Sequence, residues 1–251
     1  MAGHSHSANI KHRKNAVDAK RAKIFSKAAR NIISAVRQGG PDVDTNLKLK
    51  YAIDKAKAAN MPKDNIERAV KKGAGSKDGD DFEELVYEGY GPGGVAILIA
   101  CLTDNRNRTA PEVKYTLEHN GGNMGSTGSV AFMFDFRSIY VVDMEGDMTE
   151  DKLMELALEA GAEDVLMEGA VATVLAPATE FGAVKEALEA ANVPLLSSET
   201  GYMPQNTVTI EEKKDAARIL KLIDVLEDNE DVQNVYSNYD IPDEWLEELN
   251  S

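Results

Sequence analysis

"RSIYVVDMEGDMTEDKLMELALEAGAEDVLMEGAVATVLAPATEFGAVKEALEAANVPLLSSETGYMP" occupies residues 137–204 and alternates apolar runs with amphipathic ones. The short runs rich in Val, Ile, Leu and Tyr predict strands. The two segments with apolar residues three and four positions apart, TEDKLMELALEAGA and TEFGAVKEALEAAN, predict helices. The resulting order is β-α-β-β-α-β, which is that of a ferredoxin-like unit. Residues 137–204 therefore predict an α+β domain.

The sequence on either side predicts a second unit of the same kind. Upstream lie two expected strands, ELVYEGY and GVAILIACLTD, joined across residues 91–94. They are followed by a helix over residues 109–119, which Thr109 and Glu112 would begin as a capping box, and by a strand, SVAFMFDF. Downstream, NTVTIEE, KKDAARILKLIDVLEDN and DVQNVYSNY predict strand, helix and strand. We therefore expect residues 80–136 and 205–240 to form one ferredoxin-like domain, with residues 137–204 as a second one inserted in it.

The first 75 residues predict helices only. A first helix is expected from Asn15 to Gln38, a second over residues 45–59, and a third from Met61-Pro62 to a stop at Gly73. The apolar stripe of the first comprises Phe25, Ala29, Ile32 and Val36, and that of the second Leu47, Tyr51 and Ala58. The expected architecture is multidomain α and α+β, with an N-terminal three-helix domain over residues 1–75 followed by the two ferredoxin-like α/β domains. Residues 241–251 predict an acidic tail helix, with Trp245 docked on the body or presented to a partner.

Charge is divided unevenly along the 251 residues, whose formal net charge is −15. Residues 1–75 hold 17 Lys+Arg and 6 Asp+Glu, a net charge of +11, and the rest of the chain holds 11 and 37, a net charge of −26. Such asymmetry indicates a contact with nucleic acid or another anionic surface at one end. A solvated helical surface is the alternative interpretation.

Ten cations are candidates for binding phosphates. Most lie on the side of the first helix opposite its apolar stripe, or just before that helix; they are Lys11, Arg13, Lys14, Lys20, Lys23, Lys27, Arg30 and Arg37. Arg106 and Arg108 precede a helix N-terminus, which suits an anion, although pairing with Asp104 or the acidic surface fits equally well. Because the basic face carries mostly Lys and small residues, the sequence predicts recognition of backbone or shape, not of base edges.

Other classes of site have weak support. Cys101 lies in an apolar strand and predicts a core thiol, and no Ser-His or Cys-His arrangement stands out. The glycine loops at residues 89–94 and 119–129 predict turns, or in the second case a flexible loop facing an RNA surface. His4, His6 and His12 lack zinc spacing, although a processed Ala2-Gly3-His4 terminus could chelate Cu(II) or Ni(II). We expect no catalytic residue, cofactor, required metal, small-molecule substrate or membrane span, and a cytoplasmic location.

Long motifs carry a resemblance to a known family. MAGHSHSANIKHRK, KIFSKAARNI, NMPKDNIERAVKKG, EGYGPGGVAIL and TDNRNRTAPEV together resemble the YebC/PmpR family, which includes the mitochondrial translational activator of cytochrome oxidase subunit one. The likeness covers nearly the whole chain. It implies a helical domain followed by two α/β domains, no catalytic residues and no cofactor. The start at the family's opening motif, with no transit extension before it, suggests a bacterial member.

The resemblance also implies a role in gene expression. The family label is that of a probable transcriptional regulator with DNA-binding activity, and some members act instead on the ribosome, assisting translation of sequences such as proline runs. We therefore expect a non-enzymatic nucleic-acid-binding regulator whose partner is DNA or ribosomal RNA. Two rival classes are an enzyme that binds a phosphorylated small molecule at the glycine loops with Arg106 and Arg108, and a protein-interaction module that uses the acidic face. An enzyme of this kind would not need a separate basic helical domain, which argues against the first rival class.

Overall fold

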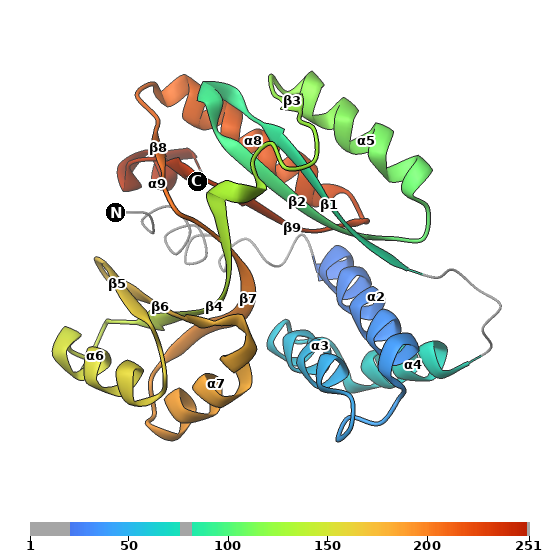
Figure 1. Ribbon diagram of the computed structural model, residues 1–251, viewed down its shortest axis with the longest axis vertical. Coiled ribbons are helices and arrows are strands. Elements are labelled where there is room, and N and C mark those ends of the chain that lie inside the picture. The colour runs from blue at the N-terminus through green and yellow to red at the C-terminus, as the bar shows by residue number, and fades with distance from the viewer. Residues whose placement is uncertain (1–20, 76–81, 250–251) are drawn as a thin grey trace.

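The computed structural model describes residues 21–75 and 82–249, which form three groups of elements (Figure 1). We call residues 21–75 the helical unit, residues 82–133 with 205–249 the outer α/β unit, and residues 134–204 the inserted α/β unit. Each has its own cluster of buried apolar side chains. The architecture is the predicted one, multidomain α and α+β, with a three-helix unit followed by two ferredoxin-like units, one inserted in the other.

The helical unit consists of α2 (Arg21–Gly39), α3 (Leu47–Ala58) and α4 (Lys63–Ala74). The predicted stripe of α2 is confirmed, since Ile32 and Val36 are buried and Phe25 and Ala29 pack beside them. Gly73 was expected to end the third helix, but the helix continues to Ala74. Gly73 instead allows α4 to approach α2 closely, because a Cβ there would lie 2.7 Å from Cβ of Val36.

The apolar side predicted for α3 is wrong. Leu47 is 58% exposed, whereas Leu49 and Ala56 are buried in the helical core. The reason is that α3 has two neighbours instead of one. Tyr51 faces the inserted α/β unit, where its ring meets that of Phe181 edge-on at a centroid distance of 4.9 Å. A single amphipathic stripe cannot describe a helix that contacts two bodies.

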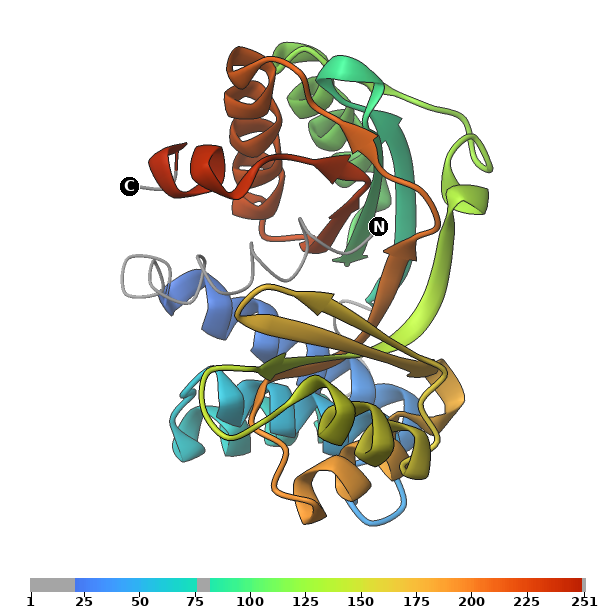
Figure 2. The same cartoon turned by 90° about the vertical axis from the view of Figure 1, so that its left-hand side faces the viewer.

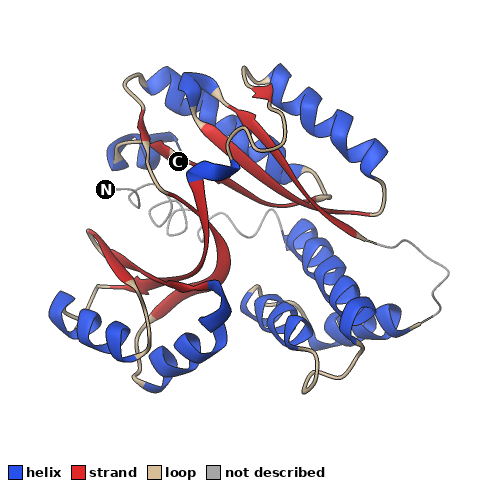
Figure 3. Ribbon diagram, in the orientation of Figure 1, coloured by secondary structure: helices blue, strands red, loops and turns tan. Residues whose placement is uncertain are grey.

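The inserted α/β unit follows the predicted β-α-β-β-α-β order. Its elements are β4 (Phe134–Asp143), α6 (Glu150–Glu159), β5 (Asp164–Glu168), β6 (Val171–Pro177), α7 (Phe181–Ala190) and β7 (Leu195–Pro204). The sheet order is β5-β6-β4-β7 with every neighbouring pair antiparallel. Helices α6 and α7 both cover one face of this sheet (Figure 3). This is the ferredoxin-like arrangement.

In the outer α/β unit, the sheet position expected for the strand at residues 206–212 is occupied by a strand from earlier in the chain. Its sheet has the order β3-β1-β2-β9, formed by β3 (Asn123–Met124), β1 (Glu83–Tyr90), β2 (Ala96–Thr103) and β9 (Val232–Ser237). Helices α5 (Arg106–His119) and α8 (Lys213–Asp228) pack on one face through a shared apolar cluster. Strand β1, which precedes β2 in the chain, therefore occupies the third-strand position of the ferredoxin-like order.

Two segments of this unit that were predicted as full strands form other structures. Residues 206–212 contribute only β8 (Val208–Thr209), which pairs in parallel with β10 (Tyr239–Asp240) in a separate two-stranded sheet. Residues 129–136 contain a short 3-10 turn, Ala131–Met133, and the beginning of β4. Strand β4 starts three residues earlier than expected because its pairing with β7 extends to Phe134 opposite Pro204.

Strands β4 and β7 also lead from the outer to the inserted unit. They run side by side as a long antiparallel ribbon that leaves the outer unit and becomes half of the inserted sheet (Figure 2). Val130, Phe134 and Tyr236 are buried with residues of β2 where the two units meet, on the sheet face opposite α5 and α8. At the other end of the chain, α9 (Asp243–Leu249) buries Leu246 and packs the half-buried Trp245 against the outer core. Trp245 is thus docked on the body.

Candidate nucleic-acid interface

Three of the candidate cations form a row along α2. Lys23, Lys27 and Arg30 are separated by four and three residues, a spacing that places them on one side of a helix. This row faces residues 227–231, where α8 ends and β9 begins. Nζ of Lys23 lies 3.0 Å from a carboxylate oxygen of Asp228, and Nζ of Lys27 donates a hydrogen bond of 2.5 Å to the carbonyl oxygen of Glu227. The row therefore contacts the acidic segment 227–231 within the same chain.

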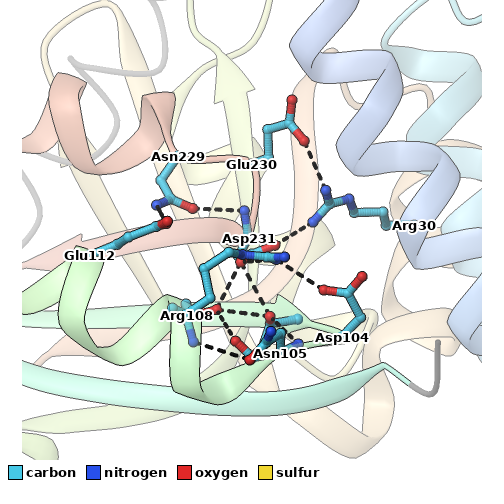
Figure 4. A network of polar contacts seen from close by, with 10 residues as sticks. Arg30, Asp104, Asn105, Arg108, Glu112, Asn229, Glu230 and Asp231 are labelled. Carbon is cyan, nitrogen blue, oxygen red and sulfur yellow. Dashed lines mark hydrogen bonds and ion pairs between the residues drawn. The ribbon is translucent and has the colours of Figure 1, made fainter.

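Arg30 makes the deepest contact of the row. Its guanidinium donates one hydrogen bond of 2.9 Å to the carboxylate of Glu230 and another of 2.5 Å to Oδ1 of Asp231 (Figure 4). The next residue of α2, Asn31, donates through Nδ2 to the side-chain oxygen of Gln233. A planar guanidinium that bridges two carboxylates gives an interface geometric specificity as well as charge.

The end of helix α8 explains why cations gather there. The last carbonyl groups of a helix have no partner within it and give that end a partial negative charge. The last turn of α8 contains no basic residue, and Glu227 and Asp228 add formal negative charge to it. Lys23 and Lys27 of α2 thus supply the positive charge that the end of α8 lacks.

Asp231 is the centre of a buried polar network. Its side chain is 3% exposed, and Oδ2 accepts a hydrogen bond of 2.7 Å from Arg108 and one of 2.8 Å from the hydroxyl of Thr109, while Oδ1 faces Arg30. Figure 4 shows Arg30 reaching the carboxylate from α2 and Arg108 reaching it from α5. Burial alone raises the pKa of Asp231, but the hydrogen bonds from Arg108, Thr109 and Arg30 outweigh it and hold the pKa below its ordinary value.

The start of α5 differs from the predicted capping box. The helix begins at Arg106, and Asn105 caps it by accepting a hydrogen bond from the backbone N–H of Arg108. Thr109 is free to bond Asp231 because it lies inside the helix, not at its cap. The side chain of Arg108 also contacts Asp104 at 2.9 Å, and its hydrogen bond to Asp231 raises its pKa further. Of the two interpretations of Arg108 that the sequence left open, internal pairing describes this structure.

The structure brings together four of the ten candidate cations. Lys23, Lys27, Arg30 and Arg108 surround residues 227–231. Arg37 lies nearer the C-terminal end of α2, 6.0 Å from the ring of Phe82, and Arg106 is exposed and pairs with Glu83 at 3.7 Å. Four further candidates, Lys11, Arg13, Lys14 and Lys20, lie outside the described residues, as does the Ala2-Gly3-His4 terminus.

The acidic run at residues 227–231 is the part of the site that sequence reasoning missed. Its signal was present, because Glu227 and Asp228 stand at the C-terminal end of a predicted helix, where cations are the favoured residues. Carboxylates in that position indicate a cationic partner from elsewhere. Lysines of α3 reach the acidic units too, since Lys50 lies 3.7 Å from Glu186 and Lys55 lies 3.3 Å from Glu199. The basic helical unit therefore contacts both α/β units through opposite charges.

The glycine-rich loop over residues 119–129 is held by one carboxylate. Glu88 of β1 is 6% exposed and accepts hydrogen bonds of 2.6–2.8 Å from the backbone N–H groups of Gly128, Val130 and Ala131. Burial raises the pKa of Glu88, but these backbone hydrogen bonds outweigh it, so its pKa lies below the ordinary value. The end of this loop is thus fixed onto the outer sheet.

Replacing Glu88 by Gln should destabilise the protein at neutral pH by about 1–3 kcal/mol, because an amide nitrogen cannot accept from the backbone N–H groups. The folded-state pKa of Glu88 is depressed, so its stabilisation is present above the pKa of the unfolded chain and is lost as pH falls through the folded pKa. Urea unfolding of both proteins between pH 7 and pH 3 measures this. The difference between wild type and variant should shrink toward low pH; a constant difference would contradict the assigned role of Glu88.

The described residues give little support for a nucleophilic cysteine, a metal site or a membrane-spanning helix. Cys101 is 3% exposed, and burial, with the nearby charge of Asp231, raises its pKa to about 12, so the thiol is not a nucleophile at neutral pH. Among residues 21–75 and 82–249 there is no group of three or more His, Cys, Asp or Glu side chains that could hold a metal ion. In the same ranges, none of the helices is long and apolar enough to cross a membrane.

Comparison with known proteins agrees with the fold. Residues 5–76 match the family model described as the TACO1/YebC protein N-terminal domain, and residues 82–239 match that of the TACO1/YebC second and third domain. A relative from Halothermothrix orenii is 50% identical over 99% of both chains, and one from Geobacter sulfurreducens is 51% identical over 99% of this chain and all of its own. Both are named probable transcriptional regulatory proteins.

A solved structure is similar as well. The crystal structure of a conserved hypothetical protein from Aquifex aeolicus is 45% identical in sequence, with a TM-score of 0.81. The match covers 90% of this chain and 93% of that one. Together the two family models span most of the residues, and the similarity extends over all three units. The chain belongs to the TACO1/YebC family.

Proposed function

We propose that this protein is a non-enzymatic regulator of gene expression that binds nucleic acid through its helical unit. The observation that carries the proposal is the row on α2, where Lys23, Lys27 and Arg30 already bind a carbonyl oxygen and three carboxylates. Phosphate oxygens are acceptors of the same kind, and Lys and Arg are the residues that bind them.

The charge of the helical unit supports the same function. Residues 21–75 hold 13 Lys+Arg and 5 Asp+Glu, a net charge of +8, whereas the chain as a whole is acidic. The proposed contact set includes Lys11, Arg13, Lys14, Lys20, Lys23, Lys27, Arg30 and Arg37. Arg106 and the exposed part of Arg108, whose guanidinium also pairs with Asp231, would form a second contact. The names of the relatives favour DNA as the partner and transcription as the process.

A second candidate partner is ribosomal RNA, which would make the protein a translation factor. Exposed aromatic side chains favour it, because unpaired bases in RNA loops stack on such rings. Phe132 is 67% exposed and Phe136 is 51% exposed, and Phe136 lies beside Tyr202 at a centroid distance of 5.0 Å. Duplex DNA keeps its bases stacked on one another, so such rings can stack on its bases only where a base step is opened.

Reversing Lys11, Arg13 and Lys14 to Glu should weaken nucleic-acid binding without changing sequence preference. Each lost phosphate contact lowers the slope of log K against log[salt] by about one, so the slope should become shallower by roughly three. Fluorescence anisotropy with duplex DNA and with a structured RNA, over a series of salt concentrations, measures it. The matched control reverses Lys114, Lys152 and Lys221, exposed lysines of the acidic units, with the same change in net charge.

Equal slopes for the wild type, the triple variant and the control would contradict binding by the N-terminal cations. Fractionation of a cell lysate on a sucrose gradient, with and without ribonuclease, then separates the two partners. Comigration with ribosomal subunits that ribonuclease abolishes supports the translation factor. Absence from those fractions together with retention on duplex DNA supports the transcriptional regulator.

A further inference from the structure

We propose that residues 227–231 act as an internal occupant of the basic face of α2, which a nucleic-acid phosphate backbone must displace in order to bind there. The inference rests on the proposed function, because it assigns the regulation of the same basic face. It adds a partner within the chain, an autoinhibitory contact, and a requirement that the helical unit separate from the outer α/β unit at this point.

The contacts of the row carry this inference. Its ligands are the carbonyl oxygen of Glu227 and the carboxylates of Asp228, Glu230 and Asp231, all within five consecutive residues. Lys23 and Arg30 are seven residues apart, about 10 Å along a helix, which is roughly three nucleotide rises of one DNA strand. A short acidic segment thus presents anionic oxygens to the row over a length that a phosphate backbone also covers.

The contact between α2 and residues 227–231 is partly exposed to solvent and can therefore open. Lys23 and Asp228 have about half of their side chains exposed (48% and 49%), and the side chain of Glu230 is 66% exposed. Exposed ion pairs are screened by water and salt and hold two surfaces together only weakly. A dense polyanion offers the same cations more negative charge than the three carboxylates in this contact do.

Withdrawal of Arg30 does not leave the carboxylate of Asp231 without hydrogen-bond partners. If Arg30 withdraws, the carboxylate keeps its hydrogen bonds to Arg108 and Thr109 and lies 3.2 Å from the hydroxyl of Thr103. All three donors belong to the outer α/β unit, so its polar network stays satisfied without α2. The guanidinium of Arg30 is then available for bidentate binding of a phosphate.

The first test removes the exposed part of the internal occupant. The double variant Asp228→Asn with Glu230→Gln keeps every cation of α2 and leaves Asp231 in place. Its matched control is Glu211→Gln with Glu212→Gln, which makes the same change in net charge at exposed residues beside the opposite end of α8. Anisotropy with duplex DNA and with a hairpin RNA at one fixed salt concentration gives the affinities.

The double variant should bind about three- to tenfold more tightly than wild type, as expected for the loss of two exposed ion pairs from the closed state. The control should change affinity less than about twofold. An equal gain in both would mean that only net charge matters, and it would overturn the inference while leaving the proposed function intact. If neither wild type nor any variant binds DNA or RNA, the proposed function itself fails.

The second test follows the contact directly in the wild-type protein. A carbodiimide joins an amine and a carboxylate that touch, so it should couple Lys23 to Asp228 across their 3.0 Å contact. The yield of that cross-linked peptide, measured by mass spectrometry, should fall at least severalfold when the DNA or RNA is added at constant ionic strength. An unchanged yield under saturating nucleic acid would show that the polyanion binds elsewhere, and the inference would be wrong.

Discussion

Replacing Asp231 by Asn should lower the free energy of unfolding by about 3–5 kcal/mol, the range for breaking a buried charge network by removing one partner. The carboxylate is 3% exposed and pairs with both Arg30 and Arg108. An amide of the same shape removes the negative charge between two guanidinium groups. It also points hydrogen atoms toward donors, so the buried donors around it lose their acceptor. Chemical denaturation at pH 7 measures the loss.

The control for Asp231 is its neighbour. Glu230 pairs with the same Arg30, but its side chain is 66% exposed, so Glu230→Gln should cost less than about 1 kcal/mol. The cost of Asp231→Asn should also decrease in acid, because the pKa of Asp231 is below its ordinary value and its stabilisation is lost as pH falls through the folded-state pKa. Similar costs for the two substitutions would mean that burial does not set the strength of this network.

Replacing Tyr140 by Ala should destabilise the inserted α/β unit by about 3–5 kcal/mol, the range for truncating a large buried aromatic residue. Tyr140 is fully buried, and its hydroxyl donates a hydrogen bond of 2.7 Å to the carbonyl oxygen of Phe181. Its ring also stacks on that of Phe181 at a centroid distance of 5.7 Å. Burial raises the pKa of Tyr140 to about 12, so the hydroxyl keeps its proton and remains a donor at neutral pH.

Tyr140→Phe separates the ring from the hydroxyl. It keeps the packing and removes only the hydrogen bond, so it should cost about 1–3 kcal/mol through the carbonyl of Phe181 that is left unpaired. Urea unfolding followed by circular dichroism compares the two variants. An alanine variant no less stable than the phenylalanine variant would contradict the assignment of Tyr140 to the core of this unit.

Local patterns explain what the sequence could predict of the fold. The order of elements in the inserted α/β unit was predicted correctly because its strands and helices alternate within 68 consecutive residues and each repeats with its own period. The outer unit was predicted less well. The segment around Val208 has the pattern of a strand, but periodicity does not say which strands pair, and β1 had already taken the position beside β2. Both segments have strand periodicity, so periodicity alone does not decide which of them lies beside β2.

The candidate site, too, was predicted only in part from the sequence. The spacing of Lys23, Lys27 and Arg30 placed them on one side of a helix, as the structure confirms by their common contact with residues 227–231. What the row touches could not be read from spacing, because Arg30 and Asp231 are 201 residues apart in sequence. The acidic end of α8 was the one available clue to the contact.

The discontinuity of the outer α/β unit gives the chain an order of assembly during its synthesis. Helices α2–α4 and strands β1 and β2 leave the ribosome first, and the inserted unit, being contiguous, can fold next as a whole. Strand β9 and residues 227–231 emerge only near the end of the chain. Until then β2 lacks its outer neighbour, and the basic face of α2 has no acidic segment to cover it. The newly made N-terminal helices thus spend most of the time of translation with their cations facing the solvent beside the ribosome.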